Sequence, residues 1–167
     1  MVDELGIRPA EAQDLPELER QFGQRHLFAE RLNRQRERRG LLLTAWRRGE
    51  VVGYVYVWLE PAEEPEIRDL HKAALISHLQ VHRGHQGEGV GGELLDIAET
   101  LLCELEFEVA ALGVDPTDDD LIAWYEDRGY SRLWNEPIRT THQMFLRRGA
   151  RIALPDECVV LAKPLTA

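Results

Sequence analysis

The stretch from Leu75 to Gly92, LISHLQVHRGHQGEGVGG, constrains this chain most. The apolar run Leu75–Val81 predicts a buried strand, and apolar residues at helical spacing from Val90 to Leu105 predict a helix. Between them, the glycines of the segment 86–92 permit a sharp turn and leave backbone N–H groups uncovered. The start of the helix adds unpaired donors and partial positive charge. The stretch therefore predicts a seat for a phosphate or pyrophosphate.

One interpretation of the loop is the dinucleotide fingerprint G-x-G-x-x-G, which Gly87, Gly89 and Gly92 match, with Glu106 or Glu108 near the position of a ribose-binding acid. That fold needs a βαβαβ run of parallel strands, and its glycine loop usually follows the first strand. Here an antiparallel hairpin precedes the loop, and only 75 of the 167 residues follow it. The order of elements therefore disfavours a dinucleotide-binding half.

The rest of the chain predicts short strands and helices in alternation. Gly40 is expected to end a helix, and a hairpin follows it around Arg48-Gly49-Glu50. No assignment is made for residues 135–150. The expected strands are 6–10, 41–47, 51–59, 75–82, 107–114, 130–134 and 158–163, and the expected helices are 14–22, 25–39, 90–105 and 121–128.

Two motifs in the right order carry a resemblance to a known family. Gln86-x-x-Gly89-x-Gly91 matches the Q/R-x-x-G-x-G/A loop of the GNAT acetyltransferases. One strand later, the segment from Asp118 to Tyr130 resembles the GNAT motif N-x-x-A-x-x-L-Y-E-K-x-G-F, with Asp118 in place of Asn. The resemblance implies a single domain over 1–167 with the α/β (α+β) GNAT fold. That fold is a mixed six- to seven-stranded sheet flanked by four helices and splayed between the strands at about 75–82 and 107–114.

The resemblance also implies that acetyl-CoA is the cosubstrate. The strand carrying Leu79 and Val81 would lie along the pantetheine, and the amides of the loop would hold the pyrophosphate. Asp118 stands where the family has a polar cofactor contact. The cofactor-binding residues implied in this way are Leu79, Gln80, Val81, Gln86, Gly87, Glu88, Gly89, Val90, Gly91, Gly92, Asp118 and Tyr125.

The family position of the acid that protonates the departing thiolate is occupied by Tyr125. The base that deprotonates the amine has two candidates, Glu60 and His78, and a water relay is a third solution. Strand alternation places Ser77 on the face of Leu79 and His78 on the other face, which counts against His78 as the base.

An arginine-rich segment, 25–39, is expected to form an amphipathic helix whose basic face points to solvent, or else lines a pocket. On the second hairpin strand, Tyr54, Tyr56 and Trp58 share one face, which favours core packing.

The formal charge of −10 argues against nucleic-acid binding and favours cationic partners. Together with the glutamate-rich segment 60–66, it favours a small cationic amine as acceptor, while a protein lysine or N-terminus remains an alternative. A non-catalytic acyl-CoA-binding module also remains open. The absence of a signal-like apolar core or an 18-residue apolar run, and two isolated cysteines without metal-ligand spacing, predict a cytoplasmic protein with no membrane span and no metal site. The resemblance further implies the late strands as a candidate homodimer interface.

Overall fold

The computed structural model describes residues 4–166. It is a mixed α/β fold with both antiparallel and parallel strand pairs. The chain forms two compact units, one made of residues up to Glu60 together with Ile76–Leu101, the other of Pro61–Leu75 and the residues from Leu102 onwards. Strand β4 (Ala73–Val81) supplies its residues up to Leu75 to the second unit and the rest to the first. The expectation of a single domain stays a prediction.

The first unit is built on an antiparallel sheet. Strand β1 (Gly6–Pro9) pairs with β2 (Gly40–Arg47), β2 pairs with β3 (Glu50–Trp58), and β3 pairs with the part of β4 that starts at Ile76. The hairpin expected between residues 41 and 59 is confirmed. Its two-residue turn, Arg48-Gly49, has φ values of 53° and 76°, the positive pair that matches the twist of a tight hairpin.

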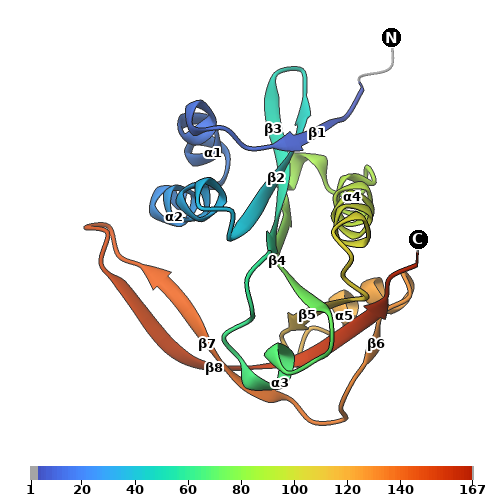
Figure 1. The fold of residues 1–167 in the computed structure, drawn as a ribbon. Helices are drawn as coiled ribbons and strands as arrows, with labels where there is room; N and C mark the ends of the chain where they lie inside the picture. The colour runs from blue at the N-terminus through green and yellow to red at the C-terminus, as the bar shows by residue number, and fades with distance from the viewer. Residues whose placement is uncertain (1–3, 167) are drawn as a thin grey trace. The chain divides into compact units, whose positions relative to one another are not determined.

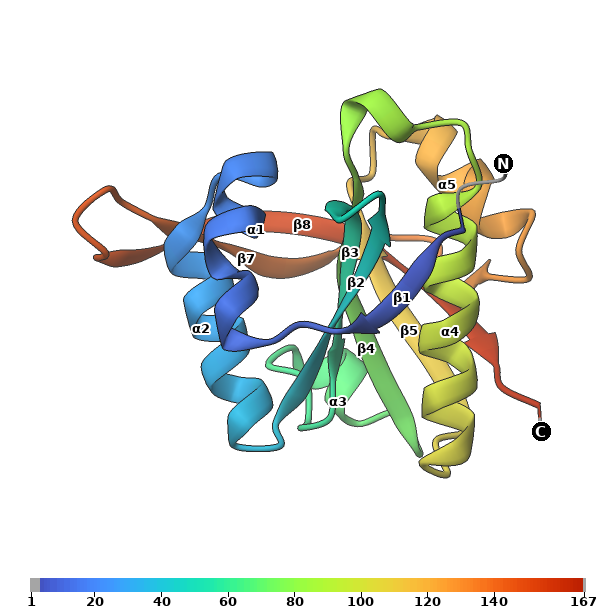
Figure 2. The same cartoon turned by 90° about the horizontal axis from the view of Figure 1, so that it is seen from above.

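Helices cover both faces of this sheet (Figure 1, Figure 2). On one face lie α1 (Leu15–Phe22) and α2 (Arg25–Arg36), which follow the short 3-10 helix η1 (Ala12–Asp14). On the other face lies α4 (Val90–Glu104), of which the residues up to Leu101 belong to this unit. The core residues between them include Leu18, Phe28, Tyr54, Val55, Leu94, Leu95 and Ala98, each exposed by 2% or less.

Gly53 lets α4 approach the sheet closely. A Cβ on this residue would lie 3.1 Å from methyl carbons of Val90 and Leu94 on α4 and 3.1 Å from the carbonyl oxygen of Gln80. A larger side chain at this point of β3 would push the helix away. The N-terminal end of α4, and with it the glycine loop, is therefore held firmly against β3 and β4.

The second unit contains the remaining strands. Strand β5 (Val109–Val114) runs parallel to β4 over three residue pairs, from Ala73↔Val109 to Leu75↔Ala111, and antiparallel to β8 (Arg151–Pro164). The two-residue strand β6 (Ser131–Arg132) pairs with β8 as well. The short helices are α3 (Pro65–Arg68) and α5 (Asp119–Glu126).

The late part of this unit departs from the sequence-based expectation. Residues 138–145, left unassigned, form strand β7 (Ile138–Phe145), and β8 begins at Arg151 instead of at residue 158. The two strands pair from Ile138↔Cys158 to Phe145↔Arg151. The first seven residues of β8 are all exposed, so this ribbon has no buried face to impose an apolar alternation on its sequence.

Candidate active site

The glycine loop adopts the conformation that its sequence predicts. Gly87 and Gly89 have φ values of 83° and 84°, and nothing lies within 4 Å of the position where a Cβ would project from either one. Helix α4 begins at Val90, and the backbone N–H of Glu93 donates to the carbonyl of Gly89 at 3.1 Å. The N–H groups that precede Glu93 in the first turn have no partner within the helix. The loop thus presents amide donors beside open space, which fits a pyrophosphate.

Side chains on both sides of the loop fix its path. The amide of Gln86 donates to the carbonyl of Val81 at 3.2 Å, which folds the loop back on the end of β4. Nδ1 of His82 accepts from the backbone N–H of Gly84 at 3.2 Å within the 3-10 helix η2 (Arg83–His85). The His82 ring also packs against Phe22 of α1, with ring centroids 6.0 Å apart.

The one acidic residue of the loop is paired with two cationic or polar neighbours. The carboxylate of Glu88 lies 2.9 Å from a terminal guanidinium nitrogen of Arg47, at the end of β2. The same carboxylate oxygen lies 3.1 Å from Nδ1 of His85. The negative charge of Glu88 is therefore compensated within the first unit.

A β-bulge in β4 changes which side chains share a face. Tyr56 pairs with Ser77 and Tyr54 pairs with Gln80, so β4 carries one extra residue opposite β3. His78 sits in this bulge with φ of 56°. The hydroxyl of Tyr54 donates to the side-chain carbonyl of Gln80 at 2.8 Å, and Nε1 of Trp58 donates to Oγ of Ser77 at 3.1 Å.

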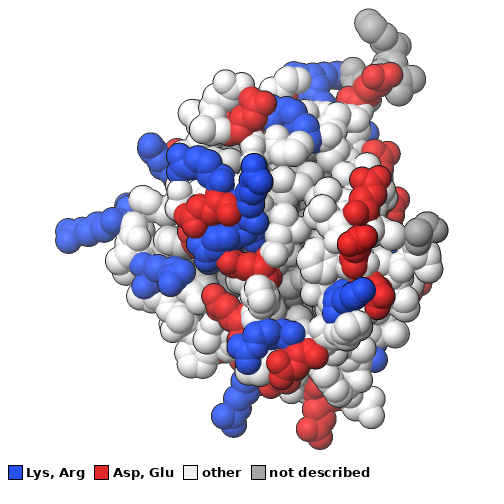
Figure 3. All heavy atoms as spheres, viewed as in Figure 1, with Lys and Arg blue, Asp and Glu red and all other residues white. Residues whose placement is uncertain are grey.

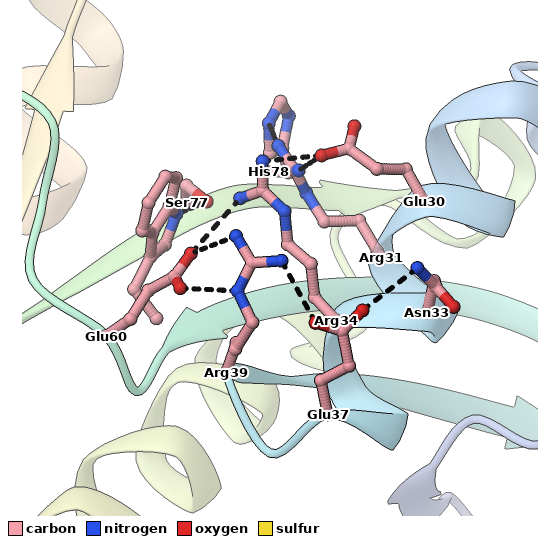
Figure 4. Close-up of polar contacts among 10 residues, drawn as sticks. Glu30, Arg31, Asn33, Arg34, Glu37, Arg39, Glu60, Ser77 and His78 are labelled. Atoms are coloured by element: carbon pink, nitrogen blue, oxygen red, sulfur yellow. Dashed lines mark hydrogen bonds and ion pairs between the residues drawn. The ribbon is translucent and has the colours of Figure 1, made fainter.

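The predicted alternation is therefore wrong at this point. Ser77 and Gln80 contact the same aromatic face of β3, although they are three residues apart. By alternation from Gln80, the side chains of Leu79 and Val81 belong to the opposite face from Ser77. His78 reaches the same α2-facing side as Ser77, because its Nε2 lies 3.2 Å from the guanidinium of Arg31 (Figure 4). Alternation no longer counts against His78.

The aromatic face of β3 carries two buried arginines of α2. The rings of Tyr56 and Trp58 meet edge to face with centroids 6.3 Å apart. The guanidinium of Arg31 lies 4.8 Å from the centroid of Tyr56, and that of Arg34 lies 5.0 Å from the centroid of Trp58. Arg31 and Arg34 expose 5% and 7% of their surfaces, so these two residues depart from the first of the two expectations for segment 25–39, a basic face that points to solvent. The aromatic side chains at positions 56 and 58 are the sequence signal that could have identified partners for these arginines.

The carboxylate of Glu60 is held in a set of ion pairs (Figure 4). Its two oxygens lie 2.6 Å and 3.2 Å from Nε and a terminal nitrogen of Arg39, and one of them lies 3.8 Å from Arg34. Arg34 also pairs with Glu30 at 2.5 Å. Both oxygens of Glu60 are thus occupied by guanidinium groups.

The ring of His78 is constrained in a related way. A guanidinium carries donors only, so the Nε2 atom that meets Arg31 must act as the acceptor. The proton of the neutral imidazole then resides on Nδ1. In this arrangement the single lone pair of His78 Nε2 is engaged by Arg31, and each oxygen of Glu60 accepts one hydrogen bond from Arg39 and keeps a second acceptor site.

In the second unit, Tyr125 lies on α5 and is 6% exposed. Its ring contacts Trp124 and Tyr130, with centroids at 5.0 Å and 5.6 Å. Burial raises the pKa of the Tyr125 phenol to about 12, and the nearby charge of Arg128 opposes this in part. The phenol is therefore fully protonated at neutral pH.

The side chain of Asp118 serves as the N-cap of α5. Its Oδ1 accepts from the backbone N–H of Leu121 at 3.1 Å. An Asn at this position would cap the helix in the same way, which explains why the replacement leaves the motif folded. Its predicted contact with the cofactor stays a prediction.

Charged side chains are unevenly distributed on the face shown in Figure 3, where some acidic side chains lie among the basic ones. Lys and Arg side chains gather over the region that Figure 1 labels α2, and Asp and Glu side chains gather over α4.

No group of three or more His, Cys, Asp and Glu side chains in residues 4–166 is arranged to hold a metal ion. Among the described helices, none combines the length and apolarity of a membrane span.

Comparisons with known proteins agree with this geometry. The structure resembles the ribosomal-protein-S18-alanine N-acetyltransferase from Escherichia coli, with a TM-score of 0.69 and 16% identity over 98% of this chain and 96% of that chain. It resembles the ribosomal-protein-alanine N-acetyltransferase from Brucella melitensis, with a TM-score of 0.64 and 23% identity over 96% of this chain and 99% of that chain. The PaiA N-acetyltransferase from Thermoplasma acidophilum, in complex with coenzyme A, matches with a TM-score of 0.67 and 12% identity over 96% of this chain and 99% of that chain.

These identities are low, so the structural matches show the fold alone. No curated protein matches the sequence. The sequence model of the acetyltransferase (GNAT) family, however, matches residues 7–130, which is most of the chain. The protein therefore belongs to the GNAT acetyltransferase family and is an acetyl-CoA-dependent acyltransferase.

Proposed function

We propose that the protein transfers the acetyl group of acetyl-CoA directly to a primary amine, with small cationic amines as the preferred acceptors. Acetyl-CoA supplies the activated acetyl thioester. The observation that carries the proposal is the loop geometry, in which Gly87 and Gly89 leave amide donors beside open space at the start of α4. The amides of residues 86–92 hold the pyrophosphate, and Leu79, Gln80 and Val81 lie along the pantetheine.

The acceptor must lose a proton before it attacks. A lysine-like amine with a pKa of about 10.4 costs roughly 4.6 kcal/mol to deprotonate at pH 7. Because Arg31 engages His78, and Arg34 and Arg39 engage Glu60, a water relay serves better as the base than either residue directly. The relay passes the amine proton to bulk solvent, and Glu60 and His78 orient the water instead of receiving the proton themselves.

The departing thiolate needs a proton donor, and we assign this role to Tyr125. Burial favours the neutral phenol, so Tyr125 carries its proton at neutral pH. With its pKa at about 12, full transfer to a thiolate of pKa about 8.5 is uphill by roughly 5 kcal/mol. Tyr125 therefore acts first as a hydrogen-bond donor that stabilises the leaving sulfur, and a later exchange with solvent completes the protonation.

Support for a cationic acceptor comes from the second unit. The pKa of the Glu64 carboxyl is raised by burial, and the charges of Glu63 and Glu66 raise it further, while hydrogen bonding, including that from Thr140, lowers it. The neighbouring carboxylates that raise the pKa of Glu64 mark a region of negative potential, and a bound cation relieves the repulsion between these charges. This region lies in the segment from which the sequence predicted attraction of an amine.

The test is release of the coenzyme thiol across a panel of amines at pH 7.5. The panel contains a polyamine, an aminoglycoside, a lysine peptide and a peptide that begins with alanine. The proposal expects the highest kcat/KM with a small cationic amine, and a Glu64→Gln variant should raise KM for it without lowering kcat. Highest activity with the alanine peptide would instead assign a protein N-terminus, as the names of two structural relatives suggest. Absence of acetyl-CoA binding by calorimetry would refute the transferase mechanism.

A further inference from the structure

The glycine loop contains a carboxylate at a place where its proposed ligand is strongly anionic. Glu88 stands between Gly87 and Gly89, the two residues whose positive φ values open the amide cradle. An unpaired carboxylate beside the phosphates would oppose binding by charge repulsion and would accept from the same N–H groups. The carboxylate is drawn to Arg47 at 2.9 Å and to His85 at 3.1 Å.

Arg47 is suited to hold this carboxylate permanently. It is the last residue of β2 and precedes the tight turn Arg48-Gly49, so its backbone is fixed by pairing with Glu50. Its side chain is 20% exposed, which partly protects the ion pair from screening. A guanidinium keeps its charge throughout the physiological range, whereas His85 carries a charge only when protonated.

Not every N–H donor of the Arg47 guanidinium has an acceptor among the described residues. Within the described chain, Nε of Arg47 is buried and makes no hydrogen bond, and one terminal nitrogen meets the carboxylate. The guanidinium therefore contacts Glu88 through one terminal nitrogen, and this contact links the end of β2 to the loop in addition to the packing of α4 at Gly53.

We propose that Arg47 is a positioning residue for coenzyme binding: by pairing with Glu88, it keeps the carboxylate off the loop amides and leaves them to the coenzyme phosphates. The inference rests on the proposed role of the loop in holding the pyrophosphate. It adds a residue from the β2–β3 hairpin, 39 positions before Gln86, to the determinants of coenzyme affinity.

The experiment is a double-mutant cycle read by isothermal titration calorimetry with coenzyme A. Arg47→Gln should weaken binding roughly tenfold, a loss that lies between the about fivefold that one charge pair at 4 Å contributes in bulk water and the much larger factor near a protein surface. Arg47→Lys should recover most of the affinity, because a charge suffices to hold Glu88. In the Glu88→Gln background, Arg47→Gln should change the Kd by less than about twofold, because no carboxylate remains to be held.

Two controls make the cycle decisive. Arg36→Gln removes an exposed positive charge from α2 and should leave the Kd unchanged, which separates pairing from net charge. Thermal melts of every variant verify that each is folded. The inference is overturned if Arg47→Gln leaves the Kd unchanged, or if its loss persists in full when Glu88 is Gln, which would make Arg47 a direct phosphate ligand. Wild-type protein that fails to bind coenzyme A would overturn the proposed function together with the inference. Normal wild-type binding, with no coupling between positions 47 and 88 in the cycle, would overturn the inference alone.

Discussion

Replacing Glu60 with Gln separates a structural role from a catalytic one. The change keeps the shape of the side chain and removes the charge that pairs with Arg39 at 2.6 Å and with Arg34 at 3.8 Å. The side chain of Arg34 is only 9% exposed, so a lost partner there leaves a nearly buried charge less well compensated. Loss of Glu60 therefore destabilises the fold around α2.

The magnitude follows from the exposure of the partners. Removing one member of a fully buried pair costs about 3–5 kcal/mol. Glu60 is 24% exposed and Arg34 keeps Glu30 as a second partner, so the expected loss is about 2 kcal/mol, comparable with a hydrogen bond to a charged group. For a chain of this length, that loss lowers Tm by roughly 4–8 °C.

The assay pairs thermal melting with steady-state kinetics measured well below Tm. Glu37→Gln is the matched control, because it also pairs with Arg39, at 3.3 Å, but its side chain is 49% exposed and its loss should cost at most about 0.5 kcal/mol. Turnover of Glu60→Gln should fall by far less than the roughly 100-fold that loss of a general base produces. A variant as stable as wild type with turnover reduced 100-fold or more would refute the structural role and make Glu60 the base.

Three further predictions concern single positions. Tyr125→Phe should lower turnover while leaving the Kd for acetyl-CoA unchanged in calorimetry. Because burial raises the pKa of Tyr125 to about 12, the phenol contributes about 2–3 kcal/mol to the free energy of unfolding below pH 10, and this contribution is lost between pH 10 and 12. In denaturant titrations, the free energy of unfolding of Tyr125→Phe should therefore fall less over this pH range than that of wild type. Gly40→Ala should cost about 3 kcal/mol in urea unfolding, because the new Cβ would lie 1.8 Å from the hydroxyl oxygen of the buried Tyr56, whereas Gly6→Ala meets nothing within 4 Å and should be neutral. Asp14→Asn should lose about 1–2 kcal/mol at pH 7; since the hydrogen bond from Arg8 lowers the pKa of Asp14, the difference from wild type should vanish as the pH falls below the folded-state pKa.

Features whose cause is local were predictable from the sequence. The glycine loop and α4 follow from residue types and spacing within one stretch, because positive φ at Gly87 and Gly89 needs no partner elsewhere. The helix that carries Tyr125 follows from its cap at Asp118 and the glycine at position 129. In these places the physical reason and the sequence signal lie within a few residues of each other.

Features set by distant partners were not predictable in the same way. Arg31 and Arg34 belong to a helix with abundant charge, and the default is to place charge in solvent. Their burial depends on Tyr56 and Trp58 of β3 and on Glu60, more than twenty residues along the chain. The ion pairs of Glu60 therefore appear only once α2 is folded against the sheet.

The ribbon of β7 and β8 escaped prediction for the opposite reason. A strand is recognised by a buried face, and the first half of β8 buries no side chain. Its pairing with β7 rests on backbone hydrogen bonds, which most polar sequences can make.

The bulge at His78 has a consequence for comparing this chain with its relatives. Deleting His78 alone would place Leu79 opposite Val55 and keep Gln80 opposite Tyr54, so the strand would become regular without inverting either end. Removing a residue from the middle of β4 on either side of the bulge would instead reverse the faces of part of the strand. The alternation of side chains between the two faces of β4 therefore changes phase at His78. Consider a relative whose corresponding strand has no bulge. A sequence alignment without a one-residue gap at His78 will match inward-facing side chains of that relative with outward-facing side chains of β4.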